Sequence, residues 1–280
     1  MVQHLIVPVD GSDASWRAVD IAVALARRCD ATVDLLEVVF ERDEVDDARA
    51  RLDERLAQHD ATGVTIGTSV HLAAESVGQG VADEVEAHPE STVVMASHGR
   101  GRSAALLGSV AEELLRLEFG PVVVVGPRCE VGDLDGPIIV TVDGSRASES
   151  VLPLAAAWGI EMRAEPWIVE VTEPDSDAPA DVGHSAYTAR LARRLAADSG
   201  HPVQFEVLRG HAVHDEVADF ASSLHASLIV ASTHGRTGMP RFVVGSTAAA
   251  IVRHAPCPVV LLRPPHVHHT EGSTHHGTEG

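Results

Sequence analysis

The stretch Leu5-Ile-Val-Pro-Val-Asp10-Gly11-Ser12 returns later in the chain as Ile138-Ile-Val-Thr-Val-Asp143-Gly144-Ser145, so both halves of the chain begin with the same apolar run and turn. Further blocks repeat in the same order: Ser97-His98-Gly99-Arg100, Gly108-Ser109 and Pro121–Val125 match Thr233-His234-Gly235-Arg236, Gly245-Ser246 and Pro258–Leu262. The offset between copies is 143 − 10 = 133 in the first block and 258 − 121 = 137 in the last. The chain is therefore a tandem duplication of a unit of roughly 130 residues.

Short apolar runs alternate with longer amphipathic stretches in both halves, a pattern typical of βαβ units and a parallel sheet. We expect strands at 4–9, 32–39, 65–71, 91–97 and 121–126, and again at 137–142, 166–172, 203–208, 227–233 and 258–262. Helices are expected at 13–29, 43–59, 75–88, 109–118, 146–158, 184–199, 212–225 and 246–254. The sequence thus predicts an α/β fold with two doubly wound, five-stranded, parallel-sheet domains of the Rossmann-like type in tandem.

Composition divides the chain at two places. Residues 129–136 lack periodicity and carry glycines and acids, so we expect a linker there, between domains at 1–128 and 137–264. Residues 265–280 contain five histidines among Gly, Thr and Glu and almost no apolar residue. This composition predicts a disordered tail with at most adventitious affinity for divalent metal.

Charge and residue usage exclude several classes of function. The net charge of −20 repels nucleic acid and anionic lipid, so neither is an expected partner. All 21 basic residues are arginine, which excludes a Walker-type phosphate loop, a kinase lysine and Schiff-base chemistry. Cys29, Cys129 and Cys257 lack redox or zinc spacing, as in a reduced, cytoplasmic protein. Without a long apolar run or a basic leader, the chain is expected to be soluble.

The repeated residues fall where open parallel sheets bind ligands, beyond the carboxyl ends of strands at which the strand order reverses. Asp10 and Asp143 end the first strand of each half. Gly108-Ser109 and Gly245-Ser246 each open a helix, whose free N–H groups and dipole attract phosphate. Glycine lets the backbone approach phosphate oxygens, and a carboxylate accepts hydrogen bonds from ribose. The pattern predicts an adenosine phosphate site in each half.

Each of these elements also has a purely structural interpretation. Ser109-Val-Ala-Glu112 is a capping box, and Asp10 and Asp143 can bond to their own turns. The histidines of the His-Gly-Arg segments can hold loop carbonyls. Because all the elements recur in order in both copies, we favour the phosphate site.

Other motifs are weak or missing. The segment Gly99-Arg-Gly-Arg-Ser-Ala104 fits the dinucleotide pattern G-x-G-x-x-A, but it follows the fourth strand and no acidic residue ends a strand about 20 positions later. We interpret it as a chance match. Neither domain body contains a G-x-S-x-G elbow or metal-ligand spacing, so no catalytic or metal-binding residue is predicted.

Together, the strand-ending Val-Asp-Gly-Ser, the His-Gly-Arg turn, the Gly-Ser helix start and the closing Pro-Val-Val strand resemble the universal stress protein family over residues 3–126 and 137–263. The resemblance implies an adenine-nucleotide-hydrolase-like fold that holds ATP, with or without Mg²⁺, through a motif G-x2-G-x9-G-[S/T]. The second half matches its nine-residue spacing, with Ser232 in place of the first glycine. The first half has Ala96 there and only eight residues between Gly99 and Gly108, so the second site is expected to fit better.

By the same resemblance, Asp10 and Asp143 would meet the ribose or adenine side, and Val38 and Val171 would line the adenine. The implied ATP-binding residues are Val9, Asp10, Val38, Ala96, Gly99, Arg100, Gly108, Ser109 and Val110 in the first half, and Val142, Asp143, Val171, Ser232, Gly235, Arg236, Gly245, Ser246 and Thr247 in the second.

The resemblance also implies that the last strands of the two halves pair across a two-fold axis. Residues 121–125 and 258–262 would otherwise be apolar edge strands, which invite aggregation. A linker of roughly ten residues spans up to about 30 Å, enough for pairing within one chain. We expect an internal pseudo-dimer, with a further homodimer left open.

Three functions follow from these residues. The leading hypothesis is an ATP-binding regulatory protein of the stress response without strong catalytic activity, because no general base or metal cluster lies beside the phosphates. The enzymatic alternative is a slow ATPase, with Mg²⁺ bridging the phosphates and Ser109 or Ser246. The third is an interaction module whose nucleotide sites have decayed, which the missing first glycines and the short first loop support.

Overall fold

A computed structural model of the chain describes residues 2–99, 107–117, 120–174, 179–234 and 244–264. In the first half these form β1 (His4–Pro8), α1 (Asp13–Cys29), β2 (Thr32–Val39), the 3-10 helix η1 (Arg42–Glu44), α2 (Val45–Leu56), β3 (Ile66–Leu72), α3 (Val77–Ala87), β4 (Ser91–Ala96), α4 (Ser109–Leu117) and β5 (Val122–Val125). The second half contains β6 (Ile138–Val142), α5 (Arg146–Glu149), α6 (Leu152–Met162), β7 (Pro166–Thr172), α7 (Pro179–Ser199), β8 (Gln204–Arg209), α8 (Val213–Ser223), β9 (Leu228–Ser232), α9 (Ser246–His254) and β10 (Val259–Leu262).

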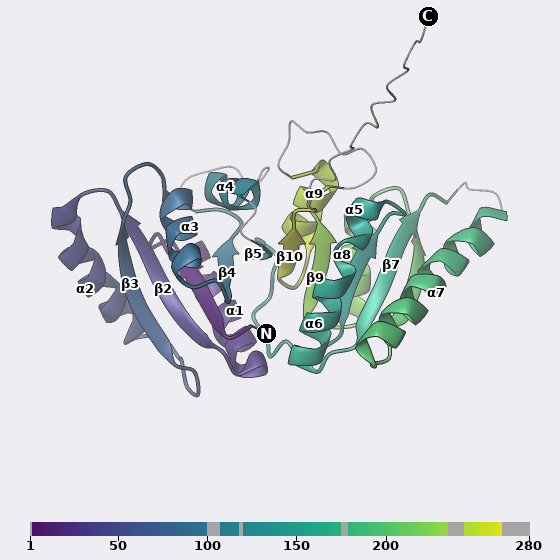
Figure 1. Cartoon of the computed structure of the whole chain (residues 1–280), viewed down its shortest axis with the longest axis horizontal. Coiled ribbons are helices and arrows are strands. Elements are labelled where there is room, and N and C mark those ends of the chain that lie inside the picture. Colours follow the sequence, from purple (N-terminus) through teal and green to yellow (C-terminus); the bar gives the residue numbers. More distant parts are fainter. Residues whose placement is uncertain (1, 100–106, 118–119, 175–178, 235–243, 265–280) are drawn as a thin grey trace, which may run out of the picture.

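The strands form one sheet in the order β3-β2-β1-β4-β5-β10-β9-β6-β7-β8. Within each half all pairings are parallel, and the order reverses direction after the first strand, which is the doubly wound arrangement predicted from the sequence. Helices lie on both faces of the sheet, and the halves stand side by side (Figure 1). The fold is therefore two Rossmann-like α/β domains in tandem.

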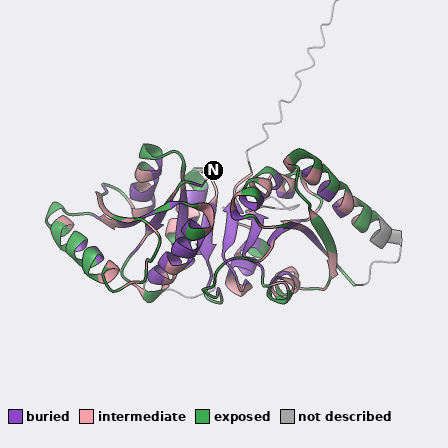
Figure 2. Ribbon diagram, turned by 90° about the horizontal axis from the view of Figure 1, so that it is seen from below, coloured by how far each residue is buried: buried purple, intermediate pink, exposed green. Residues whose placement is uncertain are grey.

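The two halves join through their last strands. β5 and β10 pair antiparallel, with Val124 opposite Val259 and Val123 opposite Val260. The apolar edges expected from the sequence thus lie at the centre of the sheet, where Figure 2 shows the buried strands of both halves meeting. The edges that remain are β3 and β8, which carry polar residues and are only partly buried, as exposed sheet edges usually are.

A hydrophobic core covers each face of this sheet and runs through both halves. Leu5 and Val7 of β1 pack into one core with Val140 of β6, while Ile6 and Ile139 face the other. Successive side chains of a strand point to opposite faces, which explains the alternation. The first core includes residues of α1, α2, α6 and α7, and the second includes residues of α3, α4, α8 and α9.

Two helices differ most from their expected extents: α7 begins at Pro179 and not at 184, and one expected helix is divided. The stretch expected at 146–158 is divided into α5 and α6, and α6 continues to Met162. Pro153 lies in the first turn of α6, and proline has no N–H to continue the ladder of the preceding turn. The break therefore follows from one residue. No helix of the described ranges is long and apolar enough to cross a bilayer.

Candidate functional site

The turn after the first strand has the same geometry in both halves. Asp10 Oδ1 accepts hydrogen bonds from the backbone N–H of Ser12 (2.9 Å) and from its hydroxyl (2.6 Å). Asp143 accepts the same two bonds from Ser145, at 3.0 and 2.6 Å. The residue between them is a glycine with φ of 76° or 83°, a conformation in which a side chain would be strained. The structural interpretation, in which each aspartate hydrogen-bonds to its own turn, is therefore correct, and these bonds use one carboxylate oxygen of each aspartate.

The second oxygen of Asp10 faces the loop after β4. A Cβ atom built on Gly99 would lie 2.6 Å from Asp10 Oδ2, closer than such atoms can approach. Glycine at this position thus lets a loop and a carboxylate from different strands meet. The neighbouring His98 is held by its Nδ1 against the hydroxyl of Ser97 (2.7 Å). Its Nε2 is buried and makes no hydrogen bond to the described part of the chain.

The helix after this loop begins at the predicted Gly-Ser pair. Gly108 donates its N–H to the carbonyl of Ser97 (2.8 Å), and its own carbonyl accepts from the N–H of Glu112 (3.0 Å). This bond makes Gly108 the cap and Ser109 the first helical residue, so Ser109 does not have the position of the serine in a capping box. The first N–H groups of α4 have no partner within the helix. They are available to an anion.

These elements enclose a cavity of about 540 Å³ at the carboxyl edge of the first half. That volume lies within the usual range of small-molecule sites, about 300–1,000 Å³. The cavity is lined by Pro8, Val9, Asp10, Ser15, Leu36, Val38, Val77, Met95, Ala96, His98, Gly99, Leu107, Gly108, Ser109, Val110 and Glu112. It includes every first-half residue named above as an ATP-binding candidate except Arg100, which lies outside the described residues.

The lining also contains residues that the sequence analysis did not find. Leu36 and Met95 are buried in the middle strands, and Val77 opens α3. Strand residues that border a cavity have the same apolar character as those that fill a core, so no sequence signal separates them. Glu112 was considered only as a capping partner, although its place in the first turn of α4 was a usable signal.

The second half repeats this arrangement as far as the structure describes it. Gly245 caps α9 without a side-chain hydrogen bond and donates its N–H to the carbonyl of Thr233 (2.7 Å). Ser232 ends β9, and its hydroxyl bonds to the carbonyl of His234 (2.6 Å). The other candidates follow the first-half pattern: Val142 ends β6 and precedes Asp143, Val171 lies in β7, and Ser246 and Thr247 begin α9. Gly235 and Arg236 lie outside the described residues.

The described site joins three kinds of surface. Buried or half-buried aliphatic side chains, among them Val9, Leu36 and Val38, form one wall. A carboxylate stands at the end of β1, and a helix amino terminus with glycine before it lies at the end of the loop. An apolar wall suits a flat ring system, the carboxylate suits hydroxyl groups, and the helix terminus suits an anion.

Comparison with known proteins gives consistent results over both halves. The family model described as the universal stress protein family matches residues 1–126 and 136–263. A universal stress protein of Mycolicibacterium smegmatis is 27% identical over 289 residues, covering 93% of this chain and 97% of that protein. One from Mycobacterium tuberculosis is 31% identical over 183 residues, or 61% of each chain. The crystal structure of a universal stress protein from Archaeoglobus fulgidus has the same fold, with a TM-score of 0.68 at 20% identity over 93% of this chain and 98% of that one.

Proposed function

The chain belongs to the universal stress protein family, and from this premise we propose that each half binds an adenine nucleotide, with ATP as the ligand, in a regulatory protein of the stress response. The observation that carries the proposal is the first-half cavity, in which residues separated by up to about 100 positions form one pocket with apolar, acidic and anion-attracting sides. The site in the second half is inferred from its repeated turn and helix start.

Each part of ATP has a partner of suitable chemistry. Val9 and Val38 would flank the adenine, and the Asp10 carboxylate would accept hydrogen bonds from ribose hydroxyls. The phosphates would bind the first N–H groups of α4, which replace the lysine that this chain lacks. His98 also lines the cavity, so its imidazole would border the ligand.

A magnesium ion fits the first half better than the second. Glu112 lines the cavity one turn into α4, so a polyphosphate at the helix terminus would meet a carboxylate. Mg²⁺ is commonly held by one carboxylate together with substrate phosphates, and it would offset this repulsion. Ser109 and Glu112 are the residues that would hold it. In the second half the equivalent of Glu112 is Ala249, since 112 + 137 = 249, so a difference in Mg²⁺ dependence between the halves is expected.

The role that we propose is ligand sensing rather than rapid turnover. In this proposal the Asp10 carboxylate contacts the ribose and not the terminal phosphate, so it would not activate water for attack on that phosphate. ATP binding with no release of phosphate above the buffer rate would support this role. Sustained release that is lost in Glu112→Gln would instead establish the slow ATPase.

The test uses paired substitutions in the two halves. Asp10→Asn and Asp143→Asn keep the oxygen that accepts the Ser12 or Ser145 bonds and remove the negative charge, so each turn is preserved. Isothermal titration of the wild-type chain with ATP should give two equivalents, and each variant should lose one. Asp133→Asn, at an exposed position in the segment between the halves, is the matched control and should bind as the wild type does.

Two results would reject the proposal. If the wild-type chain binds neither ATP, ADP nor AMP, an interaction module with decayed sites is the better description. If ATP binds but both aspartate variants retain two equivalents of unchanged affinity, the ligand lies elsewhere.

A further inference from the structure

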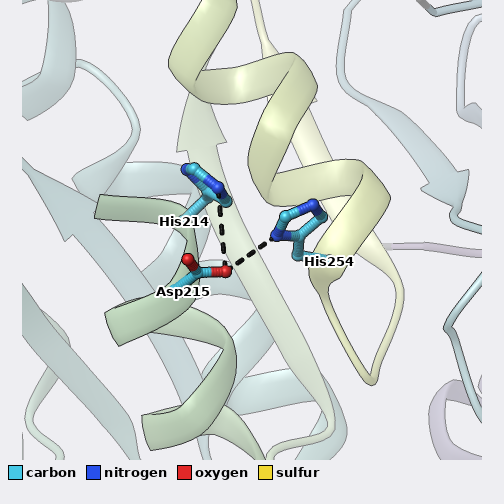
Figure 3. A group of neighbouring side chains, drawn as sticks. All are labelled: His214, Asp215 and His254. Atoms are coloured by element: carbon cyan, nitrogen blue, oxygen red, sulfur yellow. Dashed lines mark hydrogen bonds and ion pairs between the residues drawn. The ribbon is translucent and has the colours of Figure 1, made fainter. Parts of the chain in front are cut away.

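Three side chains with metal-binding groups meet between two helices of the second half. His214 and Asp215 lie in the first turn of α8, and His254 is the last residue of α9 (Figure 3). Their ligand atoms all lie within 4.8 Å of one another. His254 Nδ1 is 3.0 Å and His214 Nε2 is 3.7 Å from the same oxygen, Asp215 Oδ1. The group shares no residue with the described nucleotide site.

These distances are close to those of a metal site. In a tetrahedral zinc site with metal–ligand bonds of about 2.0–2.1 Å, neighbouring ligand atoms are about 3.3 Å apart. The two distances to Asp215 Oδ1, 3.0 and 3.7 Å, each differ from this spacing by less than about 0.5 Å. The two imidazole rings already lie with their centroids 4.4 Å apart in an edge-on arrangement.

The helices that carry the three residues are fixed by the core. Val217 and Ala221 of α8 and Ile251 and Val252 of α9 are buried in the same hydrophobic cluster. The ligand groups themselves are accessible, with side-chain exposures of 29% for His214, 25% for His254 and 56% for Asp215. A metal ion could therefore enter from solvent, meet three preplaced ligands and keep a position for water.

The first half provides an internal comparison. Val81-Ala82-Asp83 of α3 aligns with Val217-Ala218-Asp219 of α8 at an offset of 136, and Ser109 aligns with Ser246 at an offset of 137. At these offsets the counterparts of His214, Asp215 and His254 are Gly78, Gln79 and Leu117. None of these three side chains is a metal ligand of the zinc type. The group is a property of the second half and not of the repeated unit.

We propose that His214, Asp215 and His254 bind a divalent transition-metal ion of the zinc class. Two imidazole nitrogens and one carboxylate oxygen form a ligand set that zinc accepts, whereas Mg²⁺ prefers oxygen ligands throughout. The net charge of −20 favours a cation at the surface. The ion would connect α8 to the end of α9, the helix whose first residue, Ser246, belongs to the candidate nucleotide site about 12 Å away along the helix axis.

The experiment must separate this site from the five histidines of residues 265–280. The parent protein is the full chain in which these five are replaced by asparagine. Zn²⁺ binding is measured by equilibrium dialysis, and Co²⁺ binding by its visible absorption spectrum, which distinguishes tetrahedral from octahedral coordination. The parent should bind one equivalent of Zn²⁺ and show a tetrahedral Co²⁺ spectrum, and Mg²⁺ in large excess should not displace the metal.

Variants then assign the ligands. His254→Asn and, separately, His214→Asn should each lose the equivalent of Zn²⁺ and the tetrahedral Co²⁺ spectrum while keeping the circular dichroism of the parent. His211→Asn, an exposed histidine three residues before the group, is the matched control and should retain both signals. If the parent binds no Zn²⁺, or if both folded ligand variants keep the full equivalent, the proposal is wrong. ATP binding is measured on the same samples, so a failure here leaves the nucleotide proposal standing.

Discussion

Replacing Gly99 by alanine should weaken the nucleotide site of the first half. The new Cβ would lie 2.6 Å from Asp10 Oδ2, so the carboxylate has to move. Its other oxygen accepts two hydrogen bonds from Ser12, at 2.9 and 2.6 Å. A hydrogen bond to a charged group contributes about 1.5–3 kcal/mol, and losing one such bond to the ribose would weaken ATP binding by about tenfold to a hundredfold.

The assay is calorimetric titration with ATP, which reports the number of sites and the affinity of each. Gly99→Ala should leave one equivalent at wild-type affinity and weaken the other. Gly132→Ala is the matched control, because a Cβ there meets nothing within 4 Å. The unfolding free energy of both variants, from urea denaturation, shows whether the change is local.

If a folded Gly99→Ala protein binds two equivalents of ATP with the affinities of the wild type, the reasoning is refuted. That result would mean that the carboxylate of Asp10 does not contact the ligand or that its displacement has no effect. If Gly99→Ala loses both equivalents of ATP, the two halves bind ATP cooperatively. In that case Asp10→Asn and Asp143→Asn should also each lose both equivalents.

Three further predictions concern the fold. Val123→Arg places an unpaired charge where β5 pairs with β10 and should reduce the unfolding free energy, measured by urea denaturation, by about 3–5 kcal/mol. The control is Val131→Arg, at a position that is 54% exposed, which should change this free energy by less than about 0.5 kcal/mol. Trp158→Ala leaves a cavity at a fully buried position of α6 and should reduce the unfolding free energy by about 3–5 kcal/mol. Both halves should still unfold in one transition, and two separate transitions would contradict the shared core. Burial raises the pKa of the Cys29 thiol from 9.0 to about 11, so the folded protein keeps a proton that the unfolded chain loses. The stabilisation from the protonated thiol is complete below pH 9 and is lost as the pH rises towards 11. The unfolding free energy should therefore fall less over this pH range in Cys29→Ala than in the wild type. If it falls equally in both proteins, the Cys29 thiol is not the cause of the pH dependence.

Much of the fold and of the first site could be predicted because the relevant signals are local. Asp10-Gly11-Ser12 is a turn with a glycine that the positive φ requires, and Gly108-Ser109 is a helix start, so each is visible within a few residues. The pairing of the last strands was implied by the resemblance to the universal stress protein family, and it also gives a partner to an apolar strand at the end of each half. In the structure β5 and β10 pair in this way.

What could not be predicted depends on contacts between distant residues. Leu36 and Met95 line the cavity, but their sequence context is that of any buried strand. His214 and His254 are 40 positions apart and show no motif spacing, and only the packing of α8 against α9 brings them together. The division of the helix before Pro153 was the exception, since proline was a visible signal for that boundary.

The shared sheet also explains where the two halves have diverged. Core strands are constrained twice, because a residue such as Val123 packs within its own half and pairs with the other half across the seam. A substitution there affects the stability of the whole chain. Positions at the starts and ends of helices are constrained less, since surface substitutions usually change stability by no more than about 0.5 kcal/mol.

Divergence has accordingly occurred at such positions. Glu112 in the first half corresponds to Ala249 in the second, and Leu117, which is 38% exposed, corresponds to His254, while the strands of both halves keep the same order. Duplication followed by fusion of the sheets therefore preserves one scaffold and lets each half acquire its own ligands. On this reasoning, exchanging Leu117 for histidine alone will not create a metal site in the first half, because Gly78 and Gln79 supply no further ligand of the zinc type. Zinc dialysis of Leu117→His in the tail-substituted chain should still give a single equivalent of bound Zn²⁺, and a second equivalent would show that other residues of the first half supply ligands.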